Sequence, residues 1–117
     1  MVLRDVAKVL DAKILSGEDL LDKEVESAFG CDLMSDVLAF VNNKSLLLTG
    51  LMNPQVVRTA EMLDIPAIVF VRGKEPDEAT IEIAKQKGMV ILTTKLSLYV
   101  ASGKLYLEGL VGENLED

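Results

Sequence analysis

The chain has 117 residues, half of them apolar, and a formal net charge of −7 with no histidine. This length fits one domain, and an aromatic content of only 4% predicts an aliphatic core. The acidic balance argues against a general surface for nucleic acid polymers or anionic membranes, because phosphate contacts need clustered Lys and Arg. Without histidine, the chain cannot use histidine for general acid–base catalysis or metal ligation.

The cysteine count, the lengths of the apolar runs and the placement of the acidic residues further limit the kind of protein this can be. The single cysteine, Cys31, cannot form an intrachain disulfide, so a cytoplasmic protein is the default expectation. No apolar run approaches the ~20 residues of a membrane span, and the start of the chain does not resemble a secretory signal. The Asp and Glu residues look scattered over solvated faces, so we expect no resident metal and no cofactor.

In the first part of the chain the apolar spacing predicts a helix over residues 2–10 and a short strand at Ala12–Leu15. Residues Lys23–Phe29 fit either a strand or a short helix. Leu33–Val41 then predicts an amphipathic helix, with Asp32 as its N-cap. The expected inward face of this helix consists of Leu33, Val37, Leu38 and Val41.

Three buried strands are predicted in the second part, at Ser45–Thr49, Ala67–Val71 and Met89–Thr93. A polar loop and then a helix follow each strand. Strands that alternate with helices in this way lie parallel, and their right-handed crossovers place helices on both faces of the sheet. The pattern therefore predicts a mostly parallel α/β sheet in a single domain spanning residues 1–117, with a polar tail at about 112–117 that frays.

Proline, asparagine and serine mark the expected starts of the later helices. Asn53 is the expected N-cap of the first, with Pro54 at its first helical position. Pro76 is placed in the first turn of the second helix, which Gly88 ends. Ser97 is expected to cap a last helix that runs to about Leu107.

Because the three strands are predicted to be parallel, the loops that follow them should meet at one edge of the sheet, where open α/β sheets bind ligands. The first loop offers Gly50 and Asn53 at a helix start, where free N–H groups favour an anion, although an ordinary cap explains them as well. The second offers Arg72, Gly73 and Lys74, either two cations around a glycine or a solvated turn.

The third loop adds Thr94 and Lys95, with Ser97 following, and these residues fit a cleft wall or an ordinary strand end and helix cap. Leu51 and Met52 are apolar residues on a loop, and they are candidates for a protein interface or for packing. No positioned base accompanies these groups, so no catalytic residue is assigned. The candidate ligand-binding residues are Gly50, Asn53, Arg72, Gly73, Lys74, Thr94, Lys95 and Ser97.

The stretch from Ser45 to about Leu105 resembles the DRTGG domain family. It shares the order of a strand ending in Thr-Gly, a helix, a strand ending in a glycine turn, a helix ending in Lys-Gly and a strand ending in Thr-Lys. The piece Lys13–Gly17 matches the start of such domains. The chain departs from the motif that names the family, because Leu51–Met52 replaces the usual Asp-Arg pair and Val71–Arg72–Gly73 replaces Thr-Gly-Gly.

The resemblance implies a three-layer α/β/α fold like the N-terminal domain of HPr kinase/phosphorylase. It also implies an accessory role that is regulatory or dimer-forming and not catalytic. Three hypotheses follow. The first is a homodimeric module that senses a small anionic or nucleotide ligand. The second is an interaction scaffold with no small ligand, and the third is an enzyme using Lys95 or Arg72.

Overall fold

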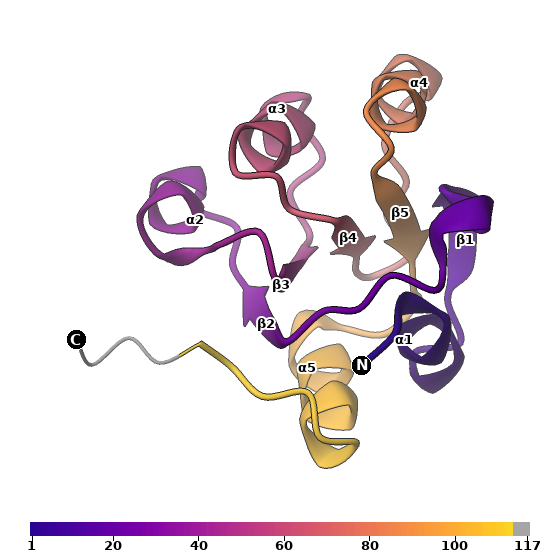
Figure 1. The fold of residues 1–117 in the computed structure, drawn as a ribbon, viewed down its shortest axis with the longest axis vertical. Coiled ribbons are helices and arrows are strands. Elements are labelled where there is room, and N and C mark those ends of the chain that lie inside the picture. The colour runs from indigo at the N-terminus through magenta and orange to yellow at the C-terminus, as the bar shows by residue number, and fades with distance from the viewer. Residues whose placement is uncertain (114–117) are drawn as a thin grey trace.

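The computed structural model describes residues 1–113, in which a five-stranded sheet lies between two layers of helices (Figure 1). The strand order is β1-β5-β4-β3-β2, and β2, β3, β4 and β5 run parallel while β1 pairs antiparallel with β5. The fold is therefore a mostly parallel α/β/α sandwich, as expected. The strands are β1 (Lys13–Ser16), β2 (Ser27–Gly30), β3 (Ser45–Thr49), β4 (Ala67–Phe70) and β5 (Val90–Thr93).

The helices divide between the two faces of the sheet, with α2, α3 and α4 on one side and α1 and α5 on the other (Figure 1). They are α1 (Leu3–Val9), α2 (Met34–Phe40), α3 (Gln55–Met62), α4 (Glu78–Gln86) and α5 (Leu98–Leu107), with a 3₁₀ turn η1 at Glu18–Leu20. Among the described residues, no helix is both long and apolar enough to cross a membrane.

The central strands are buried on both faces, which explains their continuous apolar sequences. In β4, Ala67 and Val69 join the core under α1 and α5, while Ile68 and Phe70 join the core under α2, α3 and α4. The two-residue period of the strand thus supplies both cores from one four-residue segment.

Side-chain caps start α4 and α5, and both α3 and α4 begin later than expected. The Ser97 hydroxyl accepts from the Val100 N–H at 3.2 Å, so its predicted capping role is confirmed. Asn53 Oδ1 accepts from the Gln55 N–H at 3.0 Å, but α3 begins at Gln55, so Pro54 and not Asn53 occupies the N-cap position and that prediction is wrong. Asp77 caps α4, which places Pro76 outside the helix.

The prediction for the start of α2 is wrong. Leu33, not Asp32, occupies the N-cap position, because the Asp32 carboxylate bonds to the end of β3 instead. The expected inward face is also partly wrong. Val37 and Val41 are buried, but Leu33 and Leu38 are 58% and 44% exposed.

The ambiguous segment Lys23–Phe29 contains no helix, and its strand begins only at Ser27. Before that point the chain follows the N-terminus: the Val25 N–H donates to the carbonyl of Met1 at 2.9 Å, and the terminal ammonium donates to the carbonyl of Val25. Val25 is fully buried as a result.

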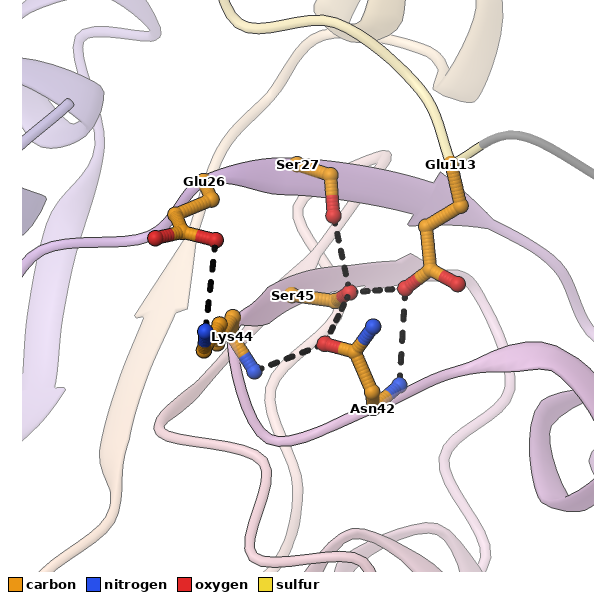
Figure 2. Close-up of polar contacts among 6 residues, drawn as sticks. All are labelled: Glu26, Ser27, Asn42, Lys44, Ser45 and Glu113. Atoms are coloured by element: carbon orange, nitrogen blue, oxygen red, sulfur yellow. Dashed lines mark hydrogen bonds and ion pairs between the residues drawn. The ribbon is translucent and has the colours of Figure 1, made fainter.

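The C-terminal segment crosses back to the edge strand β2 (Figure 2). The Ala28 N–H donates to the Val111 carbonyl at 2.9 Å, and Gly112 forms a parallel bridge with Ala28. The Glu113 carboxylate accepts from the hydroxyl of buried Ser45 and from the Asn42 N–H (Figure 2). The expectation that the tail frays is therefore wrong for residues 112–113, and residues 114–117 lie outside the described part of the chain.

Candidate functional site

Three loops meet at the carboxyl edge of the parallel strands, and we call residues 50–53, 72–75 and 94–97 together the rim. The Val71 N–H donates to the carbonyl of Thr49 at 3.1 Å, which joins the first two loops. The Arg72 and Gly73 N–H groups donate to the carbonyls of Leu96 and Thr94, each at 2.8 Å, and so join the second loop to the third. Parallel strand order and short loops thus produce the shared edge that the sequence predicts.

Arg72 holds the centre of the rim. Its backbone adopts the left-handed conformation, with φ of +58°, which is uncommon for a residue with a side chain. Its guanidinium lies against Gly50, where a Cβ atom would stand 2.6 Å from Arg72 Nη2. Gly50 therefore allows this close approach, and any side chain at position 50 would displace the guanidinium.

Asp32, which follows β2, belongs to the same edge. Its carboxylate accepts from the Thr49 hydroxyl and from the Gly50 N–H, each at 2.8 Å. These two bonds, with the nearby charge of Arg72, hold the pKa of Asp32 below its ordinary value against a smaller effect of burial. The sequence contains one indication of this role, because Asp32 closely follows Gly30 at the end of a strand. That strand was not predicted with certainty, since Lys23–Phe29 fitted either a strand or a short helix.

Several backbone donors of the rim are used by the protein itself. The Gly50 N–H goes to Asp32, the Leu51 N–H to the Thr49 hydroxyl at 3.1 Å, and the Gly73 N–H to Thr94. At the start of α3, the Gln55 N–H goes to Asn53. These bonds occupy part of the N–H set that was expected to capture an anion at this helix start, so the exposed side-chain cations are the stronger candidates for contacts to an anion.

Three such cations stand on the rim: Arg72, Lys74 and Lys95. All three are exposed, and among residues 1–113 no carboxylate lies within 4.0 Å of their nitrogens in an ion pair. Lys95 lies within Ile83–Leu107, a stretch that contains none of the 19 acidic residues, and Glu75 is the one acidic residue among the residues of the rim. The rim is thus locally more positive than the rest of this acidic chain.

A cavity of about 320 Å³ lies beside the third loop, between the end of β5, the end of α1 and the start of β1. It is lined by Leu10, Asp11, Lys13, Gly73, Glu75, Thr93, Thr94, Lys95 and Leu96. Its charges are balanced, because Lys13 pairs with Glu75 at 3.8 Å. Asp11, Lys13 and Glu75 were not among the predicted site residues; no spacing in the sequence links β1, an antiparallel edge strand, to this edge.

The structure brings only some of the predicted residues to this cavity. Gly73, Thr94 and Lys95 line it, while Gly50 and Arg72 meet one loop away. The Thr94 side chain is buried, and its hydroxyl donates to the Leu10 carbonyl at 2.7 Å, so it supports the cavity wall.

The remaining predicted residues have structural partners of their own. Ser97 caps α5 with its hydroxyl, and the Asn53 side chain accepts from the Gln55 N–H just before α3. The Lys74 carbonyl accepts from the Thr93 hydroxyl at 2.6 Å, which leaves the Lys74 ammonium as the group facing outward. Leu51 packs partly against the core under α2, α3 and α4, and Met52 is 38% exposed.

Two larger cavities, of about 610 and 540 Å³, lie at the opposite edge of the sheet around Gly88 and Met89. Glu24, Glu61 and Asp64 outnumber the lysines that line the first, and Lys87 pairs with Glu61 at 3.2 Å. The first of these cavities is larger than the one beside the rim, but the excess of negative charge in its lining makes it a poorer site for an anion. Within residues 1–113 there is no group of three or more Cys, Asp or Glu placed to hold a metal ion.

Comparison with known proteins agrees with the order of elements. The family model of the DRTGG domain matches residues 5–106. A search of curated proteins found no match. Among solved structures, the CBS and DRTGG domains of the regulatory region of Clostridium perfringens pyrophosphatase, complexed with the activator diadenosine tetraphosphate, are similar in fold, with a TM-score of 0.73 at 15% identity. The match covers 97% of this chain and 51% of that one, so this chain spans about half of its length. With a family match over most of its residues and this fold, the chain belongs to the DRTGG domain family.

Proposed function

We propose that this chain is a non-catalytic regulatory module that binds a small anionic or nucleotide ligand at the rim and works as a homodimer. The observation that carries the proposal is the convergence of Arg72, Lys74 and Lys95, without carboxylate partners among residues 1–113, on loops whose backbones are joined. Charge-assisted bonds from such groups are the strong contacts to phosphate. In this proposal the DRTGG-like unit spans the whole chain.

Two features support a binding role over a catalytic one. The chain has no histidine, and the carboxylate of Asp32, which lies near Arg72, accepts from Gly50 and Thr49 and has a lowered pKa. A general base needs a free position and a pKa near the working pH. The similarity to a regulatory region crystallised with a nucleotide activator supports the same choice of role.

The exposed position of Arg72 makes it the contact to test first. Diadenosine tetraphosphate, ATP and inorganic phosphate are titrated into the wild-type chain and into Arg72→Gln, with unfolding temperature and calorimetric affinity as readouts. Binding raises the unfolding temperature by mass action, and Arg72→Gln is expected to weaken it about tenfold or more. Arg4→Gln is the matched control, because Arg4 lies at the far end of α1 beside Leu21 and pairs with Asp22 on the surface.

Loss of binding in Arg72→Gln but not in Arg4→Gln supports a ligand at the rim. The proposal fails if no probe shifts the wild-type unfolding temperature, or if both variants bind as the wild type does. A scaffold without a small ligand is the second candidate, and the exposed apolar side of α5 favours it.

A further inference from the structure

Helix α5 carries a second apolar side, directed away from the sheet. Its inner side, with Ala101 and Leu105, is buried in the core. On the opposite side Tyr99, Tyr106 and Leu107 are 87%, 65% and 86% exposed. A helix that is apolar all round is normally covered all round. In Figure 1, α5 lies at the outer edge of its layer of helices.

The apolar positions on this side are symmetric about a glycine. Tyr99, Val100, Gly103, Tyr106 and Leu107, which we call the outer face of α5, fall at −4, −3, 0, +3 and +4 relative to Gly103. Together they line a shallow apolar hollow with Ser102 and Lys104. This spacing is the same in both chain directions. If a second copy of the helix packs antiparallel with the two Gly103 residues in contact, Val100 therefore lies opposite Tyr106 of the partner subunit. A two-fold interface requires this self-complementarity.

The packing of a single protomer does not require glycine at position 103. Glycine is, after proline, the poorest helix former, and a Cβ atom at position 103 would meet no atom within 4 Å. At the centre of a helix pair, by contrast, the missing side chain lets two backbones approach closely.

Charge and area also fit a second copy. Two chains of net charge −7 repel each other, but α5 contains no Asp or Glu and a single charged residue, Lys104. Since one aromatic side chain buries about 150–250 Å² when covered, the outer face offers on the order of 500 Å² per protomer. That area approaches the ~800 Å² that each partner gives to a standard interface, and is large for a lone surface patch.

We infer that the outer face of α5 is the homodimer interface, with two antiparallel α5 helices crossing at Gly103. This inference rests on the homodimer in the proposed function, and it does not depend on the ligand. The outer face of α5 shares no residue with the rim, because α5 starts after the third loop and packs on one face of the sheet.

The test is the molar mass of the wild-type chain and of Tyr106→Glu, measured by light scattering and sedimentation over a range of concentrations. The wild type is expected at twice the 12.7 kDa mass of one chain. Tyr106→Glu is expected to weaken the dimer by at least about thirtyfold, the effect of an interface hot spot. Met62→Glu is the matched control, since Met62 is 73% exposed on α3, in the other layer, and its charge should leave the dimer intact.

Gly103→Ala adds a test in which the stability of the monomer and the affinity of the dimer are expected to change in opposite directions. Alanine improves the helix and should raise the unfolding temperature of the Tyr106→Glu monomer, yet it should weaken the dimer in the wild-type background. Circular dichroism confirms that each variant is folded.

A wild-type monomer at all concentrations overturns both the interface and the homodimer. A dimer that survives Tyr106→Glu overturns this interface and leaves the homodimer to another surface, such as Leu51 and Met52. Nucleotide titration of the Tyr106→Glu variant keeps the two proposals apart, because the ligand site predicts retained binding whatever the mass of the protein.

Discussion

The rim and the outer face of α5 lie a few residues apart in the chain, but they differ in how their groups are satisfied. At the rim the backbone N–H groups of Gly50, Leu51 and Gly73 all have partners within the protein. On the outer face of α5, large apolar side chains remain in solvent. The rim is thus held together by its own hydrogen bonds and exposes charged side chains. The outer face of α5, in contrast, exposes apolar side chains that would be buried only by a partner. Substitutions should therefore affect folding at the first region and association at the second.

The largest effect on folding is expected at Thr94, which connects the rim to the end of α1. Its buried hydroxyl donates to the Leu10 carbonyl and accepts from the Leu96 N–H at 3.3 Å. Thr94→Val keeps the shape but leaves both groups without a partner, so the free energy of unfolding should fall by about 1–3 kcal/mol. Urea unfolding measures the change. Thr94→Ser keeps the hydroxyl as a control, and an equal loss in both variants would contradict the assigned hydrogen bonds.

A smaller and pH-dependent effect is expected at Asp32. Its folded pKa lies below the ordinary value of 3.8, so its charge stabilises the fold fully above that value, and the stabilisation disappears as the pH falls through the folded pKa. Asp32→Asn keeps an acceptor but removes the charge. It should lower the unfolding temperature at about pH 7, and its difference from the wild type should shrink as the pH falls below 3.8 through the lowered folded pKa of Asp32.

The measurement is a pair of thermal unfolding series across pH. A difference that stays constant over the whole range would show that the charge of Asp32 makes no contribution at the rim. Cys31→Ser serves as a neighbouring control with no change of charge, and its difference from the wild type should not vary across the same range.

The smallest effect on folding is expected on the outer face of α5. Leu107 is 86% exposed, so Leu107→Ser should change the free energy of unfolding of a single protomer by no more than about 0.5 kcal/mol. Urea unfolding of the variant in the monomeric Tyr106→Glu background measures this term alone. A loss as large as that of Thr94→Val would mean that Leu107 packs within its own protomer.

The strand and helix pattern of the second half was predictable because each buried strand is a continuous apolar run followed by a glycine, proline or cap residue. The meeting of the loops at positions 50, 73 and 94 follows from parallel order alone. The placement of Asp32 was not predictable in this way, because β2 is short and only partly buried. Its pairing with β3 is a tertiary contact that no local period in the sequence records.

Other features depend on contacts between distant parts of the chain. The cavity wall at Lys13 and Glu75 requires β1 to pair antiparallel with β5, and the placement of residues 112–113 depends on the contact of Glu113 with Ser45 (Figure 2). Leu33 and Leu38 fit the helical period but are exposed, because Met34, Val37 and Val41 form the side of this segment that packs in the core under α2, α3 and α4. In each case, long-range pairing overrides a reasonable local pattern.

The ligand site at the rim is tested most directly by NMR titration of the labelled chain with diadenosine tetraphosphate, following the backbone amide signals. Binding at the rim predicts that the largest shifts cluster at Gly50, Arg72–Gly73 and Thr94–Leu96, and that Arg72→Gln removes them. Shifts that cluster instead around Gly88 and Met89 at the opposite edge, or no saturable shifts at all, would contradict it.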